Sequence, residues 1–484
     1  MKKRSSLRHC IVLGIVFAVC LALQSCGNNY YYAGRTLPPS GLLNRVLIAE
    51  QDPSAFSTGS GALPFVDAFY DIRHAYNAST GSFSISGYSG KEPTTIQNMP
   101  EEETGAVYGS GDGDYALINY AGEKIAGTVT IPGGLSTSIF ITHDLRYVYA
   151  ANNINHVLSV VDRTTGGSYA LNLPNVETIS VNAGGTIVLA FLQNSNDVYT
   201  VVRLNAAEQT AAANNPHYVY TNPTTGQTVT AEDCEPQNLP QYCVFPVATG
   251  TTQFDRPVKA IFSPDGSTAY VINCGPECGG TTSGLTTIPI TGSSLNSGSV
   301  GASGITLTAS GFTAVPGGAT NGIFSGNNLY VAGQQYQQSS GLFEGFLTTL
   351  SIPANTITST NSISDGTHNK MVFGDQNTLW IGAAQCQAGV RYQEASSGQN
   401  VQYGCLTMFN TSTNAVTVDA YKGDGTGVAA VLGLDKVYTA EGGQVYIYNT
   451  STMAELNNAN VTVTGTAVDV AYMDAASDGD NTTY

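Results

Sequence analysis

Six cysteines between residues 234 and 405 have the spacing of disulfide partners. Six cysteines allow about fifteen pairings, of which the simplest joins sequence neighbours: Cys234 with Cys243, Cys274 with Cys278, and Cys386 with Cys405. Such a framework is typical of an exported protein. Zinc is the rival use, but the CGPEC segment lacks the usual knuckle spacing and has no nearby histidine. We therefore predict three disulfides, no metal site and no cofactor.

Residues that could carry out hydrolysis are sparse. The chain has no G-x-S-x-G segment, so it lacks a nucleophile elbow, and its histidines do not have the H-E-x-x-H spacing. A hydrolytic site would instead need an acid and a histidine that converge from separate repeats. Glu177, Arg256 and His368 are the trio that could do so.

Four long polar segments carry residues suited to binding. They span residues 51–63, 273–285, 333–345 and 383–404, and are rich in Gln, Ser and Gly. Tyrosine among small polar neighbours is typical of surfaces that recognise sugars or proteins. The alternative is that these segments are tolerated insertions made rigid by disulfides. The candidate binding residues are Tyr336, Phe343, Arg391, Tyr392 and Tyr403.

A repeated strand hairpin must position all of these residues. In residues 260–273, AIFSPDGSTAYVIN, two β-prone runs flank a Pro-Asp-Gly turn, in which Pro presets φ and Gly accepts a positive φ. The same plan recurs about every 40–50 residues, which indicates a radial array of small sheets, the β-propeller. We predict an all-β fold with eight four-stranded blades, labelled A (innermost) to D (outermost); seven blades is the alternative.

Closure of the ring follows from a missing strand. The first unit begins with a B-like strand at residues 44–50, so its A strand must come from residues 466–474. Unit four continues into a long polar insertion at about residues 206–252. The B–C and D–A connections share one face of a propeller, so the long segments and the mouth of the central channel should lie together. One residue per D–A connection gives the predicted ring: Glu92, Glu177, Arg256, Asn321, His368 and Asp424.

The composition argues against a nucleic-acid partner. The 484 residues carry a net charge of −17, with 18 Lys and Arg in total. A nucleic-acid-binding surface needs a basic stripe that this chain cannot supply. The acidity is consistent with solubility. The oligomeric state is left open.

The N-terminal segment predicts export. Lys2, Lys3, Arg4 and Arg8 precede an apolar run of signal-peptide length, residues 11–23. The following Leu-Gln-Ser-Cys resembles the bacterial lipobox, which implies lipid attachment at Cys26 and, with Gly27 after it, outer-membrane sorting. The predicted organisation is a signal peptide (1–25), a lipidated tether (26–43), a propeller (44–474) and a polar tail (475–484).

The best-defined repeat also resembles a known family. Residues 262–266, FSPDG, and 269–273, AYVIN, are similar to the YVTN-type β-propeller repeat, which is related to lactonase-like propellers. Residues 436–438 and 329–331 keep the outline of that repeat. The resemblance implies the fold and carries no catalytic residue. We therefore predict a lipid-anchored, non-catalytic module of the cell envelope that binds a protein or glycan through its long B–C segments. The alternative is a lactonase-like hydrolase at the channel mouth.

Overall fold

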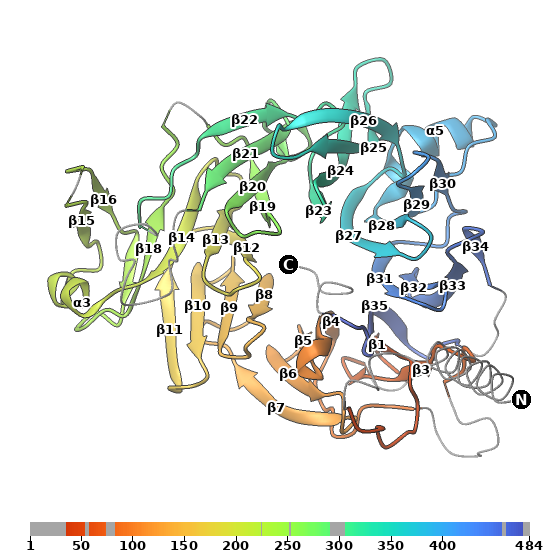
Figure 1. Cartoon of the computed structure of the whole chain (residues 1–484), viewed down its shortest axis with the longest axis horizontal. Coiled ribbons are helices and arrows are strands. Elements are labelled where there is room, and N and C mark those ends of the chain that lie inside the picture. Colours follow the sequence, from red (N-terminus) through yellow and green to blue (C-terminus); the bar gives the residue numbers. More distant parts are fainter. Residues whose placement is uncertain are drawn as a thin grey trace, which may run out of the picture.

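The computed structural model describes residues 35–53, 58–73, 83–223, 225–250, 253–290, 305–456 and 461–477. Eight antiparallel sheets are arranged radially around a central axis, with the A strand of each sheet nearest the centre (Figure 1). The predicted all-β propeller with eight blades is thereby confirmed. Cys26 and the predicted signal peptide lie outside the described residues. No helix among the described residues is long and apolar enough to cross a membrane.

The ring closes through strands from the two ends of the chain. Strand β35 (Thr466–Tyr472) is the A strand of blade one and pairs antiparallel with β1 (Arg45–Gln51), with Val46 opposite Tyr472. The C strand is interrupted into β2 (Gly61–Ala62) and β3 (Phe65–Asp67), both paired with β1. Ser84 bridges to Pro64 at the D position. The predicted closure is confirmed.

Blades two and three are regular four-stranded sheets. Blade two also carries a short 3-10 helix, η2 (Pro100–Glu102), between its first two strands. The strands of blade two are β4 (Pro93–Met99), β5 (Thr104–Gly109), β6 (Asp114–Asn119) and β7 (Lys124–Thr130); those of blade three are β8 (Ser138–Ile141), β9 (Tyr147–Asn152), β10 (Val157–Asp162) and β11 (Gly167–Asn172).

Blades five to eight repeat the same order. Their strands are β19 (Pro257–Phe262), β20 (Thr268–Asn273), β21 (Gly284–Pro289), β22 (Gly311–Ala314); β23 (Asn321–Ser325), β24 (Asn328–Gln337), β25 (Leu342–Ser351), β26 (Thr356–Ser362); β27 (Thr367–Gly374), β28 (Thr378–Ala384), β29 (Leu406–Asn410), β30 (Val416–Val418); and β31 (Gly425–Val431), β32 (Lys436–Glu441), β33 (Gln444–Asn449), β34 (Ala454–Glu455).

The β19–β20 hairpin forms as its sequence predicts. Ile261 pairs with Tyr270, and the turn between the strands places Gly266 at φ +68°. The carboxylate of Asp265 accepts hydrogen bonds from the hydroxyls of Ser263 (2.6 Å) and Ser267 (2.8 Å). These bonds satisfy polar groups at the turn locally, so the hairpin forms from residues close in sequence.

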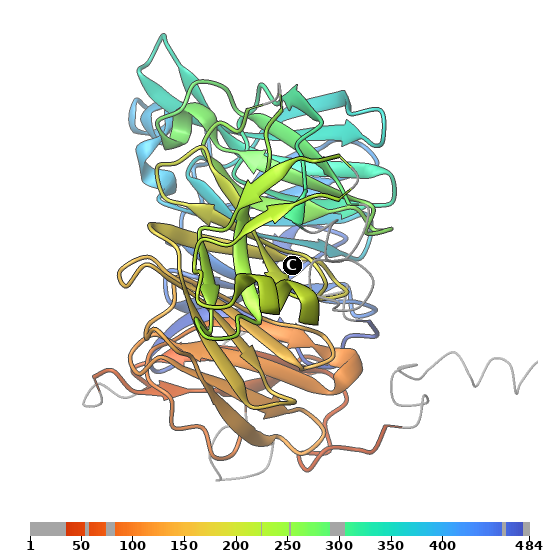
Figure 2. The same ribbon diagram turned by 90° about the vertical axis from the view of Figure 1, so that its left-hand side faces the viewer.

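Blade four departs from the prediction. Its first strands are β12 (Val176–Val181), β13 (Val188–Leu192) and β14 (Val198–Arg203). The segment expected to be a polar insertion contains the outer strand, β18 (Tyr242–Pro246), and a fifth strand, β17 (Asp233–Glu235), which Cys234–Cys243 joins. Helix α3 (Ala206–Ala212) and the hairpin of β15 (Val219–Thr221) and β16 (Thr228–Thr230) lie outside this blade (Figure 2). The D strand was missed because α3, the β15–β16 hairpin and β17 separate it from β14 in the sequence.

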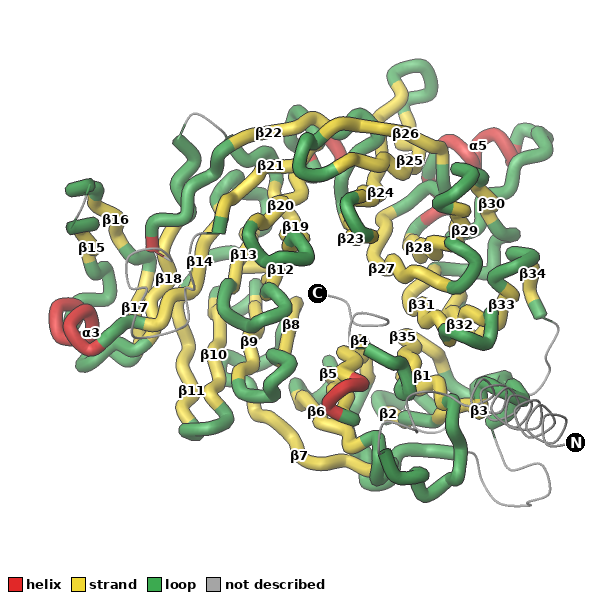
Figure 3. The backbone as a smooth tube through the Cα atoms, in the orientation of Figure 1, coloured by secondary structure: helices red, strands yellow, loops and turns green. Residues whose placement is uncertain are grey.

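The segment 333–345 also differs from expectation. It was predicted to be a long B–C loop, but β24 and β25 stay paired as far as Gln337 and Leu342, so it is a projecting β-hairpin with a short turn. Segment 383–404 contains a 3-10 turn, η4 (Cys386–Ala388), and helix α5 (Val390–Ser396). The α-helices α3 and α5 lie at the periphery of the ring (Figure 3).

The core consists of separate layers between neighbouring blades. Between blades seven and eight, Trp380 is fully buried against Tyr448, with ring centroids 5.6 Å apart. Equivalent layers join blades three and four, and blades eight and one. Burial of alternate strand residues against the next blade supplies most of the stabilisation, and leaves the connections free to vary.

Candidate functional site

Three structured connections of blades five, six and seven stand on the B–C face. The 274–283 connection contains a 3-10 turn, η3 (Gly275–Cys278), closed by the Cys274–Cys278 disulfide. The β24–β25 hairpin projects beside it, and α5 packs against β25. The Cys386–Cys405 disulfide joins the two ends of the blade-seven connection. All three predicted disulfides are therefore present, and each fixes a connection near or within one blade.

Asp255 holds the blade-five connection against the channel mouth. Its carboxylate accepts hydrogen bonds from Thr281 N (2.9 Å), Thr281 Oγ1 (2.5 Å) and Thr282 N (2.7 Å). Burial acts to raise the pKa of Asp255, but these donors outweigh it and lower the pKa below its ordinary value. These hydrogen bonds fasten residues 281 and 282 of the connection to Asp255.

A groove runs around this connection. Three adjoining hollows of about 640, 580 and 390 Å³ make it up. Arg256 lines the first and third hollows, and residues 280–282 line the first and second. We call this continuous depression the B–C groove; volumes of this size suit small ligands or short chain segments.

Two of the predicted binding residues line the second hollow. Tyr336 on β24 and Phe343 on β25 contact each other edge to face, with centroids 5.4 Å apart. The Tyr336 side chain is 47% exposed, so its ring is accessible to a ligand in this hollow. Gln334, Gln335 and Gln338 line the same hollow. The hairpin therefore presents an aromatic surface beside amide groups.

A second aromatic cluster lies beside the blade-seven disulfide. Tyr392 and Tyr403 meet edge to face at 5.3 Å, and Tyr403 stacks on Tyr421 at 5.5 Å. Gln387 donates a hydrogen bond to the Tyr421 hydroxyl. Tyr392 is exposed and Tyr403 is half-buried. Both predicted tyrosines are thus on the same face as the B–C groove.

The guanidinium group of Arg391 is hydrogen-bonded to other residues of the protein. Its Nε donates to the carbonyl oxygen of Ile363 at 2.6 Å, and its Nη2 donates to Ser362 Oγ at 3.1 Å. These bonds fasten α5 to the segment that precedes blade seven. The side chain predicted to bind a ligand therefore positions the helix that carries Tyr392.

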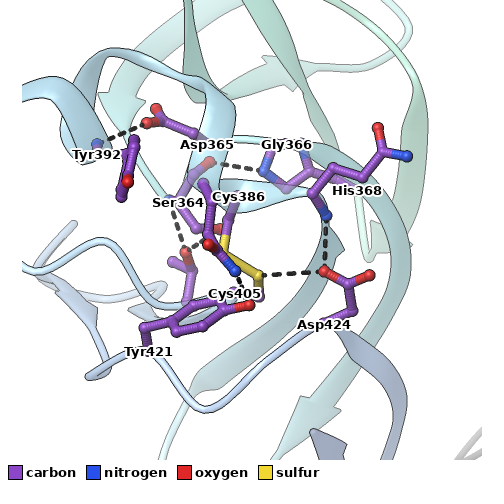
Figure 4. Close-up of a disulfide and its surroundings, with 12 residues drawn as sticks. Ser364, Asp365, Gly366, His368, Cys386, Tyr392, Cys405, Tyr421 and Asp424 are labelled. Atoms are coloured by element: carbon purple, nitrogen blue, oxygen red, sulfur yellow. Dashed lines mark hydrogen bonds between the residues drawn. A yellow bond between two sulfur atoms is a disulfide. The ribbon is translucent and has the colours of Figure 1, made fainter. Parts of the chain in front are cut away.

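Asp365 joins the hairpin to the helix. Its carboxylate accepts hydrogen bonds from Gly345 N (3.2 Å) and Arg391 N (2.7 Å). It also accepts one from Tyr392 N (3.4 Å), which Figure 4 shows. Burial raises the pKa of Asp365 to about 6, although these donors favour the charged form. One buried carboxyl thus sets the relative positions of both aromatic clusters.

The proposed catalytic trio is divided by the fold. Glu177 and Arg256 line the third hollow, where Asn153 Nδ2 donates to Glu177 and Arg256 donates to the carbonyl oxygen of Asn194. His368 is 1% exposed on β27, and its Nε2 donates to the carbonyl oxygen of Ser364 at 2.9 Å. Burial lowers the pKa of His368 to about 4, so the ring is neutral at pH 7.

The other ring residues have separate surroundings. Asp424 accepts a hydrogen bond from Gln385 N at 2.8 Å, and Asn321 accepts one from Lys259 Nζ at 2.9 Å. Glu92 adopts a positive φ of 47° just before β4. Within the described ranges, no three His, Cys, Asp or Glu side chains are grouped to hold a metal ion.

Glu277 is a site residue that the sequence did not reveal. It lies in η3 and lines the third hollow with Glu177. Its Oε1 accepts a hydrogen bond from Gln334 Nε2 at 2.6 Å, while its buried Oε2 has no partner among the described residues. Burial raises its pKa to about 7. Its place inside the CGPEC disulfide loop was the available signal.

Comparison with known proteins supports the fold. No protein-family model matches the chain, and no curated protein matches it in sequence. The structure of the dihydro-heme d1 dehydrogenase NirN is 11% identical, with a TM-score of 0.52 over 89% of this chain and 75% of that chain. A periplasmic gluconolactonase of Pseudomonas aeruginosa is 14% identical, with a TM-score of 0.42 over 89% of this chain and 98% of that chain. Kuenenia stuttgartiensis hydrazine synthase is 12% identical, with a TM-score of 0.46 over 78% of this chain and 99% of that chain. At such identities the likeness extends to the propeller fold alone.

Proposed function

We propose that this propeller is a non-catalytic binding module of the cell envelope and that it holds a glycan chain in the B–C groove. The observation that carries the proposal is the groove itself, where exposed Tyr336 stands beside Phe343 and a row of glutamines. Aromatic faces pack on sugar rings, while amides and hydroxyls can donate to and accept from sugar hydroxyls.

The proposed location at the envelope rests on two features. The lipobox-like sequence at Cys26 would attach the chain to a membrane by lipid, with the outer membrane favoured by Gly27. The three disulfides suit an oxidising compartment outside the cytoplasm. Membership of the YVTN-type repeat family belongs to the same proposal, since the best-defined repeat has that pattern.

Binding to a panel of envelope glycans, measured with residues 35–477, tests the proposal. We expect Tyr336→Ala combined with Phe343→Ala to weaken glycan binding at least ten-fold. Tyr70→Ala is the matched control, because Tyr70 is 66% exposed on blade one, away from the groove. Labelling of Cys26 with a lipid precursor in cells tests the anchor separately.

Three results would reject the glycan-binding proposal. The first is glycan binding that the double substitution does not change. The second is glycan binding that Tyr70→Ala reduces as much as the double substitution does. The third is binding of a protein, and of no glycan, through Tyr336 and Phe343. The last result would replace the glycan with a protein ligand and keep the groove as the site.

A hydrolase is the second candidate function, and Glu277 is the observation that favours it. A carboxyl group with a pKa of about 7 and a second carboxylate, Glu177, line one hollow. Pairs of acids in different protonation states can divide the roles of general acid and general base. Lactone and ester turnover by the wild type, lost in both Glu277→Gln and Glu177→Gln, would support it; no turnover would exclude this reaction class.

A further inference from the structure

A second cavity opens on the opposite face of the ring. It has a volume of about 550 Å³ and lies between the innermost strands of blades five, six and seven, next to the A–B turns of blades four and five. Residues 182–184 and 263–266 form its rim. None of its lining residues belongs to the B–C groove, so it is independent of the function proposed above.

One cationic side chain lines this cavity. Lys259 on β19 reaches its wall, and Nζ donates to Asn321 Oδ1 at 2.9 Å. No carboxylate among the described residues lies within ion-pair distance of this amine. Lys370 on β27 is near enough to repel Lys259, but it is paired with buried Asp469 at 2.9 Å. Among the described residues, Lys259 therefore has a neutral partner, Asn321, and no carboxylate as counter-charge.

The remaining walls are mostly apolar. Ile261, Ile323, Met371 and Phe373 come from β19, β23 and β27, and line the space between Lys259 and the rim. A cation beneath an apolar passage is complementary to an acid with a hydrocarbon or aryl body. The volume is in the range of small-molecule sites.

We propose that this cavity binds an apolar monocarboxylate, with the carboxylate hydrogen-bonded to Lys259 Nζ and the body against Ile261, Ile323, Met371 and Phe373. The charge-assisted bond would supply the counter-charge that Lys259 lacks. Transfer of the apolar body from water into the cavity would contribute a favourable free energy of binding. Binding at this rim leaves the B–C groove free.

The charges around Lys259 set the pH range for binding. Burial, followed by repulsion from Lys370, lowers the pKa of Lys259 to about 8. Asp469 is paired with Lys370, and Asp265 at the rim accepts hydrogen bonds from Ser263 and Ser267. At pH 7 the amine is therefore charged, and it is neutral at pH 10, where binding of the carboxylate should be lost.

Calorimetry with decanoate and its neutral analogue 1-decanol at pH 7 tests the proposal on the full mature chain. We expect wild type and Lys259→Arg to bind decanoate more tightly than decanol. Lys259→Met keeps the stem and removes the charge, so its decanoate affinity should fall at least ten-fold while its weak decanol affinity stays the same. Lys124→Met, an exposed lysine on β7, is the matched control.

Melting curves establish that each variant is folded before binding is compared. The proposal is overturned if wild type does not bind decanoate at 1 mM (roughly 4 kcal/mol of binding free energy). Equal decanoate affinity in Lys259→Met and wild type would also overturn it. So would an equal loss in Lys124→Met, or retention of full decanoate affinity at pH 10.

Discussion

Arg45 and Asp474 lie 429 positions apart and form a buried ion pair at the seam of the ring. Nη2 and Nε of Arg45 contact the two carboxylate oxygens of Asp474 at 2.6 and 3.0 Å. Arg45 also donates to Glu123 at 2.9 Å. The seam between the two ends of the chain is therefore joined by side chains as well as by the β1–β35 ladder.

Removing one partner of this pair should weaken the fold. Asp474→Ala leaves Arg45 buried without its bidentate acceptor, a change that costs about 3–5 kcal/mol. Urea unfolding should show this decrease in the free energy of unfolding. Lys124→Ala, at an exposed site, should change stability by less than about 0.5 kcal/mol. Equal stability of the two variants would contradict a structural role for the pair.

The blade-seven disulfide should raise the free energy of unfolding more than the blade-five disulfide does. Cys386–Cys405 spans 19 positions and Cys274–Cys278 spans 4. In the chain-entropy description these loops correspond to about 3 and about 2 kcal/mol. Thermal unfolding of the two double Cys→Ala variants measures the difference. A larger loss from the shorter loop would show that loop closure is not the main source of stabilisation.

Glu277 should make stability depend on pH. Its pKa is raised from the ordinary value of 4.5 to about 7 by burial, so the folded state holds more protons than the unfolded state between these values. Stability from this group is therefore greatest at low pH and declines as the pH rises from about 4.5 to 7.

Comparison of variants at pH 5 and pH 8 checks this dependence. Glu277→Gln should lose less stability than the wild type between the two values, because Gln stays neutral. Glu102→Gln, at an exposed position, is the control and should follow the wild type. Parallel curves for wild type and Glu277→Gln would show that Glu277 has an ordinary pKa.

The contact between the hairpin and blade seven should depend on Gly345. A Cβ atom at this position would lie 1.7 Å from the carbonyl oxygen of Ser364. Gly345→Ala should cost about 3 kcal/mol through steric overlap and displace Tyr336. Gly311→Ala is the matched control, since nothing lies within 4 Å of its Cβ position. Unfolding curves and Tyr336-dependent glycan binding provide the measurements; unchanged values in Gly345→Ala would rule out close packing there.

The strand hairpins, the number of blades and the disulfide pairs could be predicted from the sequence. The β19–β20 hairpin and the blade number follow from alternating apolar residues and turn chemistry, which act over short distances. The β1–β35 pairing followed from the missing A strand of the first unit, which a closed ring must take from the other end of the chain. The three disulfides followed from proximity in sequence. Hairpins and blades were predictable because the structure of each repeat depends mainly on its own residues and on the neighbouring repeats.

Other features that depend on contacts between distant residues could not be predicted. The outer strand of blade four is separated from β14 in the sequence by α3, the β15–β16 hairpin and β17. Residues 333–345 continue β24 and β25 although their polar composition indicates a loop. Arg391 was predicted to bind a ligand, and its hydrogen bonds to Ser362 and Ile363 could not be read from the sequence. Glu277 gained its raised pKa from burial by blade six, which no pattern within the CGPEC segment reveals.

The position of β35 also determines when folding can finish. Blade one lacks its innermost strand until residues 466–472 have been made, and every blade depends on its neighbours for burial. Until then, the inner edge of β1 has no partner strand. An unpaired strand edge of this kind favours aggregation until the ring closes.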